Sequence, residues 1–258
     1  MKFFKITKNI FFLIIIGGIL ISNFAMAQGS SQLKQLFYKG SRFYKEAKYD
    51  EAIAAYKEIV DKGYESANLY YNLGNCFFKK GEFGRAIAYY EKAKLLMPQD
   101  RDLEANYRHV KSLVKLQGSG FEKHGIVGAL ERFYSRFTIN GMTVFLFLLY
   151  LTAVLLVIAF IVIKIPRLYF GMGVFVLAAA FILTFFMLRE RSLNFGRQAI
   201  VASRQAQAKF EPFERATTYF TLSEGVKVKI ISRNDGWCKI KRSDGKIGWV
   251  KKEELQAI

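Results

Sequence analysis

The sequence has few of the residues that catalysis and metal binding require. It contains two histidines, His109 and His124, and two cysteines, Cys76 and Cys238. The histidines stand outside any metal-ligand spacing, and no P-loop, GxSxG or HExxH motif occurs. We therefore predict that the protein is not an enzyme and uses no metal or cofactor. Because the cysteines belong to different modules, we expect two buried free thiols rather than a disulfide.

Charge is absent from two long stretches. Gly141–Ile163 and Leu168–Leu188 contain no Asp, Glu, Lys or Arg. As helices they would extend roughly 35 and 32 Å, against a hydrocarbon core of about 30 Å. The sequence thus predicts transmembrane helices at 141–163 and 168–188, joined by a cytoplasmic loop at 164–167. A purely soluble enzyme is excluded, and the lack of ionisable residues in both helices argues against an ion or proton path.

The N-terminus has the three regions of a signal peptide. Lys2, Lys5 and Lys8 precede the apolar run Ile10–Ile21, and Ala25-Met26-Ala27 has the small–x–small form that signal peptidase cleaves. We predict a signal peptide at residues 1–27 and an extracytoplasmic segment after it. Two further crossings would return the C-terminal part to that same side of the inner (cytoplasmic) membrane.

The chain is strongly basic, with a formal net charge of +18. Lys and Arg number 19 against 13 acidic residues in 28–140, and 15 against 8 in 189–258. Outside the cell, such an excess favours anionic lipid or an anionic wall polymer as a neighbour and makes nucleic acid improbable. The alternative is that these charges are only the solvated faces of helices and strands.

Residues 32–98 repeat with a period of 34. This shift superposes Gly40 on Gly74, Tyr56 on Tyr90, and Ala52-Ile53-Ala54 on Ala86-Ile87-Ala88. The second copy, which ends at Pro98, resembles the tetratricopeptide (TPR) pattern, in which small residues lie where paired helices touch and aromatics fill the gaps. We predict a TPR domain at 28–117, with repeats at about 33–66 and 67–100 and a cap helix at 101–117.

The segment 118–140 is predicted to be a linker that contains a helix. Ile126, Leu130, Phe133, Tyr134 and Phe137 recur on one helical face. This helix either lies at the membrane interface or docks on the TPR stack.

Residues 189–258 alternate with the period of β-strands. Val226, Val228 and Ile230 alternate with lysines, and short turns that contain Gly236 and Gly245 separate further strands. The region resembles a bacterial SH3 domain, with a first strand at 199–201; the family's ligand-groove loop is replaced by Lys209–Phe213. The predicted protein is therefore multidomain, with an α-helical TPR solenoid, a transmembrane α-hairpin and a small all-β SH3-like barrel.

Two binding surfaces are predicted. The first helix of each TPR copy lines the concave face, where amide and ammonium donors among aromatics would suit an extended peptide with a carboxylate; several of these aromatics could instead be core. The residues are Lys34, Phe37, Ser41, Tyr44, Lys45, Asn68, Tyr71, Asn75, Phe78 and Lys79. On the barrel, a groove for a wall peptide would use Phe210, Phe213, Trp237 and Trp249, although the tryptophans could instead be barrel core or rim.

The order of modules is similar to that of the BatE-type proteins of bacterial aerotolerance operons. This resemblance implies a role in stress tolerance within an envelope complex whose other members include proteins with von Willebrand A domains. Two hypotheses follow. The protein is a scaffold that holds partner envelope proteins in its TPR groove at the lipid bilayer, or it is a wall-binding module whose SH3-like domain contacts peptidoglycan.

Overall fold

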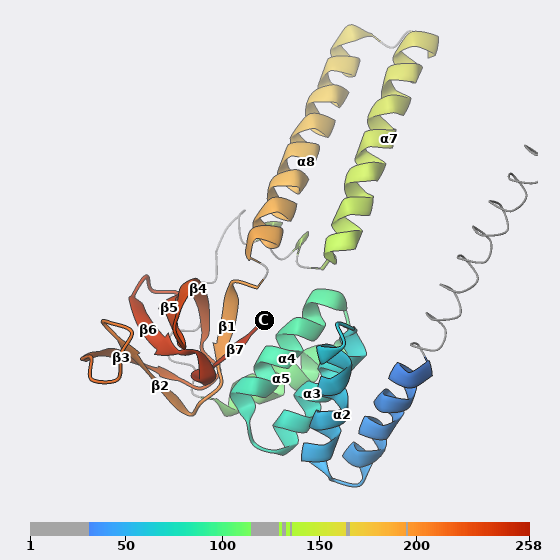
Figure 1. Ribbon diagram of the computed structural model, residues 1–258. Coiled ribbons are helices and arrows are strands. Elements are labelled where there is room, and N and C mark those ends of the chain that lie inside the picture. The colour runs from blue at the N-terminus through green and yellow to red at the C-terminus, as the bar shows by residue number, and fades with distance from the viewer. Residues whose placement is uncertain (1–30, 115–128, 131–132, 135, 164–165, 195) are drawn as a thin grey trace, which may run out of the picture. The chain divides into compact units, whose positions relative to one another are not determined.

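The computed structural model describes residues 31–114, 129–130, 133–134, 136–163, 166–194 and 196–258. The predicted signal peptide and most of the predicted linker helix lie outside these residues. The chain divides into two compact units at Glu65 and Ser66, and each is described by itself. Within them the structure confirms the predicted fold class: TPR-like helices, two apolar helices and a C-terminal antiparallel sheet (Figure 1).

The first unit contains one helical hairpin, formed by a helix at residues 31–45 and α2 (Tyr49–Asp61). The helices approach closely at Gly40, where an added Cβ would lie 2.7 Å from the Tyr56 ring. The Tyr56 hydroxyl reaches the first helix and lies 3.0 Å from the Ser41 Oγ. The small residue and the aromatic therefore hold the pair together as the repeat pattern predicts.

The second unit begins with α3 (Ala67–Lys79), α4 (Phe83–Leu96) and α5 (Arg101–Leu113). Ser66 caps α3 by accepting the Leu69 N–H, and Asp100 caps α5 by accepting the Leu103 N–H at 2.8 Å. Gly74 repeats the contact of Gly40, since a Cβ there would lie 2.5 Å from the Tyr90 ring. The predicted cap helix α5 packs on α4.

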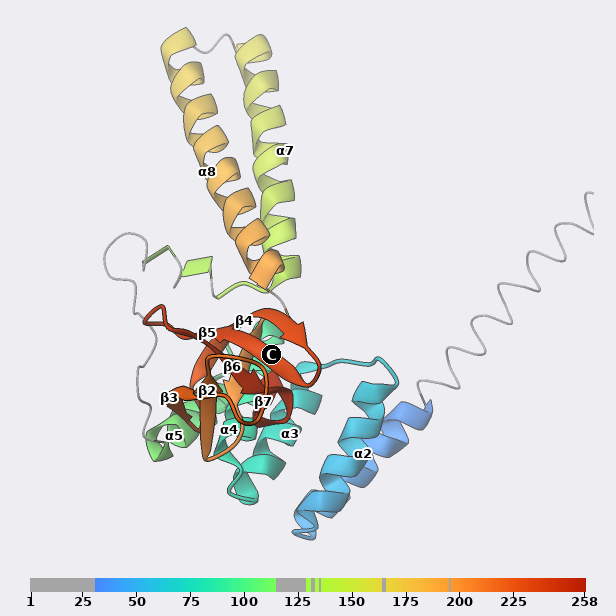
Figure 2. The ribbon, with the colours of Figure 1, turned by 60° about the vertical axis from the view of Figure 1, so that its left-hand side comes forward.

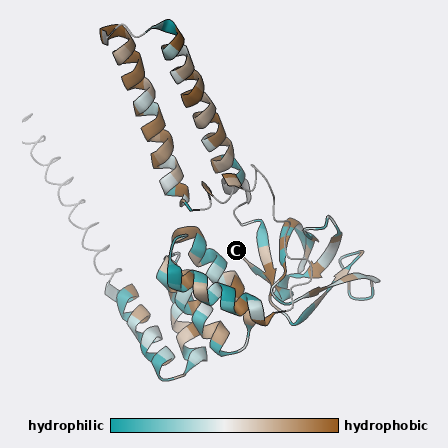
Figure 3. Ribbon diagram, turned by 180° about the vertical axis from the view of Figure 1, so that it is seen from behind, coloured by the Kyte–Doolittle hydropathy of each residue, from teal (hydrophilic) through white to brown (hydrophobic). Residues whose placement is uncertain are grey.

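Two long apolar helices follow, α7 (Ile139–Ile163) and α8 (Arg167–Asn194). Each contains a 24-residue stretch that is long and apolar enough to cross a membrane, with hydropathies of 3.0 and 2.4. The helices run side by side (Figures 1 and 2), and Figure 3 shows hydrophobic residues along both. They touch through stacked Phe160 and Phe170 rings, 4.1 Å apart, and at Gly173, where a Cβ would meet Leu156 at 3.0 Å.

The end of the predicted linker segment contacts α8. Tyr134 is buried, and its hydroxyl lies 2.8 Å from the Oγ1 of Thr184 in α8, which is also buried. The Arg136 carbonyl accepts a hydrogen bond from Gln99 at 3.0 Å. The described part of this segment therefore has contacts both with α8 and with the turn that precedes α5.

The C-terminal part is a seven-stranded antiparallel sheet in the order β3-β2-β6-β5-β4-β1-β7. The strands are β1 (Gln198–Val201), β2 (Gln205–Lys209), β3 (Thr218–Ser223), β4 (Lys227–Asn234), β5 (Trp237–Lys241), β6 (Ile247–Lys251) and β7 (Leu255–Ala257). Gly236 and Gly245 have φ angles of +80° and +91°, which explains glycine in these hairpin turns.

The core of the sheet consists of the residues that alternate inward. They are Ala199, Val201, Ala206, Ala208, Leu222, Val226, Val228, Ile230, Cys238, Ile240 and Val250. In β4 the intervening Lys227 and Lys229 are exposed, as the period-two pattern predicts.

Helix α4 contacts the sheet at β1 and β7. The Gly84 N–H at the start of α4 donates to Glu224 Oε1 at 2.7 Å, and a Cβ on Gly84 would lie 2.2 Å from the Val201 carbonyl oxygen. Lys227 pairs with Glu91 of α4 at 3.1 Å. With a period of 34, Gly84 is equivalent to Asp50 of the first copy, and Glu91 is equivalent to Lys57. The two copies therefore differ at these two positions of contact with the sheet.

We expect Gly84→Ala to loosen the contact between α4 and the sheet. Alanine favours a helix over glycine by about 1 kcal/mol, so α4 itself should not be weakened. The added methyl group instead meets a backbone carbonyl, which moves only if the sheet moves. Hydrogen exchange of the full-length protein should therefore be faster in β1 and β7. Asp50→Ala, at the equivalent position of the first copy, is the control; equal protection in wild type and both variants would contradict the expectation.

Candidate functional site

The predicted surface of the first TPR copy is accessible in the structure. Lys34 and Lys45 are exposed, whereas Phe37, Ser41 and Tyr44 are half-buried. Ser41 is held in place, because its Oγ donates to the Phe37 carbonyl at 3.0 Å and contacts the Tyr56 hydroxyl. This helix therefore presents two ammonium groups beside partly covered aromatic rings.

The equivalent surface of the second copy has the same character. Asn68 and Lys79 are exposed, and Tyr71, Asn75 and Phe78 are half-buried. The Asn75 Oδ1 accepts a hydrogen bond from the Tyr90 hydroxyl at 2.6 Å, which matches the contact of Ser41 with Tyr56 in the first copy. In each copy, then, the hydroxyl of the tyrosine at the equivalent repeat position, Tyr56 or Tyr90, fixes a polar side chain of the predicted surface.

Helix α5 adds two residues to this surface that the sequence analysis did not include. The Asn106 Nδ2 donates to the Tyr71 hydroxyl at 2.7 Å and lies 3.4 Å from the Asn75 Oδ1. The exposed His109 ring meets Phe78 edge-on, with 5.6 Å between ring centroids. One further step of 34 residues from Asn75 leads to His109, so extending the repeat period into the cap helix would have found it.

These contacts determine what Asn75 can offer to a ligand. Its carbonyl oxygen is occupied by two donors, Tyr90 and Asn106, which orients the amide so that its Nδ2 group keeps donor capacity. A donor of this kind, with the exposed Lys79 ammonium on the same helix, suits a carbonyl or carboxylate acceptor. The half-buried rings of Tyr71 and Phe78 provide apolar contact area beside it.

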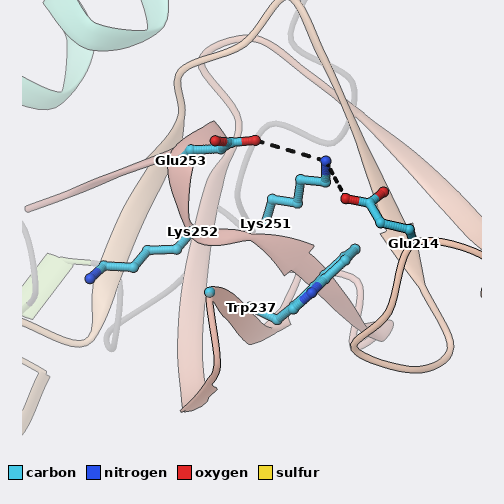
Figure 4. A pocket seen from close by; sticks show the side chains of 6 residues that line it. Glu214, Trp237, Lys251, Lys252 and Glu253 are labelled. Carbon is cyan, nitrogen blue, oxygen red and sulfur yellow. Dashed lines mark ion pairs between the residues drawn. The ribbon is translucent and has the colours of Figure 1, made fainter.

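The sheet carries a separate pocket of about 500 Å³. It is lined by Glu214, Gly236, Trp237, Lys251, Lys252 and Glu253 (Figure 4). Lys251 Nζ lies 2.6 Å from Glu214 and 3.8 Å from Glu253. The hydrogen bond from Lys251 holds the pKa of Glu214 below its usual range, and the same bond raises the pKa of Lys251. The pocket therefore presents both signs of charge beside an aromatic ring.

Of the four predicted groove residues, the structure brings only Trp237 to this pocket. Trp249 lies on the neighbouring strand, half-buried, with the Lys239 ammonium 5.8 Å from its ring. Phe210 and Phe213 are exposed in the connection after β2, where Phe210 contacts Tyr219. The residues that complete the pocket instead, Glu214 and Lys251–Glu253, are charged and showed no sequence pattern of their own.

A half-buried carboxylate, that of Glu91, lies at the contact between α4 and the sheet. Burial would raise the pKa of Glu91, but the Lys227 ammonium and the Tyr107 hydroxyl, which donates at 2.5 Å, hold its pKa below the usual range. Glu91 is therefore ionised at neutral pH and serves as a structural partner. Within the described part of the chain, no group of His, Cys, Asp and Glu side chains is placed to hold a metal ion.

The fold thus defines a protein built from interaction modules, namely helical repeats and a small antiparallel sheet flanking a pair of apolar helices. Comparison with protein families supports both modules. A tetratricopeptide repeat family matches residues 39–101, and a bacterial SH3 domain family matches residues 212–256. The second match begins after β1 and β2, which belong to the same sheet. A search of curated proteins gave no match to the chain.

Both cysteines are buried free thiols, as predicted. Burial raises the pKa of Cys76 to about 12, so at pH 8 only about one thiol in ten thousand is ionised. We therefore expect no alkylation of Cys76 by iodoacetamide in the native protein at pH 8, and complete alkylation in denaturant. Mass spectrometry of the peptides measures both states; rapid native alkylation at Cys76 would show that α3 and α4 open readily.

Proposed function

We propose that this protein is a membrane-anchored extracytoplasmic scaffold that binds other envelope proteins through its TPR helices. The observation that carries the proposal is a cluster on α3 and α5 in which half-buried Tyr71, Asn75, Phe78 and Asn106 lie beside the exposed His109. Its polar groups are positioned by internal hydrogen bonds, and such preorganisation lowers the entropic cost of binding a partner. The family match to TPR repeats supports a protein as the partner.

The finer part of the proposal rests on the resemblance to BatE-type proteins. We infer that the partners include membrane or periplasmic proteins with von Willebrand A domains and that the assembly contributes to aerotolerance. The exposed Lys34, Lys45 and Lys79 favour an acidic segment or a chain terminus of such a partner. Anchoring by α7 and α8 would keep the assembly at the inner membrane.

The pocket around Trp237 in the sheet favours a second function, the binding of peptidoglycan. Peptide stems of the wall carry amines and carboxylates, and the pocket offers Glu214, Glu253 and two lysines around Trp237. The match to the bacterial SH3 family supports this candidate. It differs from the first in its site, which lies on the sheet rather than on the TPR helices.

The scaffold proposal predicts that Asn68→Ala with Lys79→Ala removes partner capture. Both side chains are exposed, so the fold should be retained, whereas Asn75→Ala would deprive the Tyr90 hydroxyl of its acceptor. The control is Glu65→Ala with Arg101→Ala, which removes two other exposed side chains, one of each charge. The measurement is affinity purification from crosslinked membranes followed by mass spectrometry.

With Asn68→Ala and Lys79→Ala we expect about tenfold less recovery of partner proteins, which corresponds to a loss of about 1.4 kcal/mol in binding free energy. The control should recover as much partner protein as wild type. Equal recovery with both would contradict the scaffold proposal. Recovery of wall fragments alone, at the same level from every variant, would favour the peptidoglycan function.

The proposed topology predicts which positions a membrane-impermeant maleimide can reach. With the natural thiols buried, single cysteines at Glu65 and Lys246 should be labelled in intact spheroplasts, because both positions are exposed and proposed to lie outside. Arg167→Cys, between the two apolar helices, should be labelled only after permeabilisation. Labelling of Arg167→Cys without permeabilisation, or protection of Lys246→Cys, would contradict this topology.

A further inference from the structure

A row of side chains, three of them exposed and one half-buried, crosses four strands at one end of the sheet. The strand register pairs Gln198 of β1 with Lys229 of β4, Lys229 with Lys241 of β5, and Lys241 with Ile247 of β6. Directly paired residues of antiparallel strands point to the same face, and the exposed Lys229, Lys241 and Ile247 point away from the core. We call Gln198, Lys229, Lys241 and Ile247 the basic row.

The two lysines of this row are an unfavourable pair within the protein. Like charges directly opposite one another destabilise a sheet. Among the ion pairs formed by described residues, none includes the ammonium group of Lys229 or Lys241. By contrast, Lys227, two residues before Lys229, is paired with Glu91. The basic row therefore has a charge that an external anion would neutralise.

Exposed apolar and basic side chains surround the row. Ile231, which follows Lys229 by two residues, is 49% exposed, and Ile247 is 42% exposed. Arg197 and Arg233 are also exposed, and Arg233 donates to the Gly196 carbonyl at 3.1 Å, which holds it next to the start of β1. Isoleucines among lysines and arginines are typical of a surface that rests at a membrane interface. A soluble polyanion would provide no apolar contact for Ile231 and Ile247.

The chain itself holds this row near the end of an apolar helix. The apolar stretch of α8 ends at Glu190, the helix ends at Asn194, and Gln198 begins β1. Four helical residues add about 6 Å, and four extended steps add at most about 14 Å. Gln198 is thus held within roughly 20 Å of the point where α8 would leave the membrane, and Lys229 and Lys241 lie one and two strands farther across the sheet, about 4.8 Å per strand. A connection this short keeps the basic row within reach of the headgroups.

We propose that the basic row is a binding surface for the headgroups of anionic phospholipids, with Lys229 and Lys241 contacting phosphate groups and Ile231 and Ile247 at the headgroup boundary. The proposal rests on the proposed insertion of α7 and α8 into a membrane and goes beyond anchoring, because it assigns lipid recognition to the sheet. It also leaves the Trp237 pocket free, since that pocket lies at the opposite end of β5 from Lys241.

The test uses the full-length protein reconstituted in nanodiscs. A fluorophore on Lys246→Cys, next to Ile247, reports approach to headgroups through quenching by a nitroxide on the lipid headgroup. Nanodiscs of phosphatidylcholine are compared with nanodiscs that also contain phosphatidylglycerol. The test variant is Lys229→Glu with Lys241→Glu, and the control is Arg204→Glu with Arg215→Glu, which makes the same change in net charge at exposed positions in the connections before and after β2.

For wild type and control we expect about threefold stronger quenching with phosphatidylglycerol, lost at about 0.5 M salt. The test variant should show no difference between the two lipids, and Lys229→Gln with Lys241→Gln should behave likewise while relieving the repulsion within the sheet. Equal quenching of wild type in both lipids, or a lipid difference that survives in the Gln variant, would overturn the proposal. Failure of the protein to enter nanodiscs would instead contradict membrane insertion, and partner capture remains a separate measurement.

Discussion

The apolar surface of α7 and α8 is the constraint on which the organisation of this protein depends. Apolar side chains such as Val162 and Phe175 are 72% and 74% exposed, although the two helices pack against each other. Burial of apolar surface is worth about 25 cal/mol per Å². Exposure of such a large apolar area to water would therefore be unfavourable. Both helices are long and apolar enough to cross a membrane, which would provide an apolar environment for this surface.

The two repeats form similar helical hairpins that differ in their contacts. Both copies keep the glycine–tyrosine contact, at Gly40 with Tyr56 and at Gly74 with Tyr90. The second copy has Gly84 at the position equivalent to Asp50 and Glu91 at the position equivalent to Lys57. Both residues contact the sheet, Gly84 through Glu224 and Glu91 through Lys227. The first helices of the copies retain aromatic and polar residues at the same positions, which is consistent with a shared role in binding.

The outer face of the sheet is divided among three environments. Lys227 lies where α4 packs, Trp237 and Lys251 form part of the charged pocket, and Lys229 and Lys241 belong to the basic row. Alternation along each strand places all of these residues away from the core, and the register between strands sorts them into separate places.

The sequence alone determined the modules of this protein, because each depends on a local periodicity: charge-free stretches of helical length, a repeat of 34 residues and alternation in β4 with glycine turns at 236 and 245. It also located the polar and aromatic residues of the first TPR helices. Only the tertiary structure decided which residues join them. Asn106 and His109 come to α3 through the packing of α5, and Glu214 comes to Lys251 through the folding of the sheet. The pairing of Lys229 with Lys241 is likewise a product of strand register, since charges twelve residues apart carry no periodic signal until hydrogen bonding between strands places them side by side.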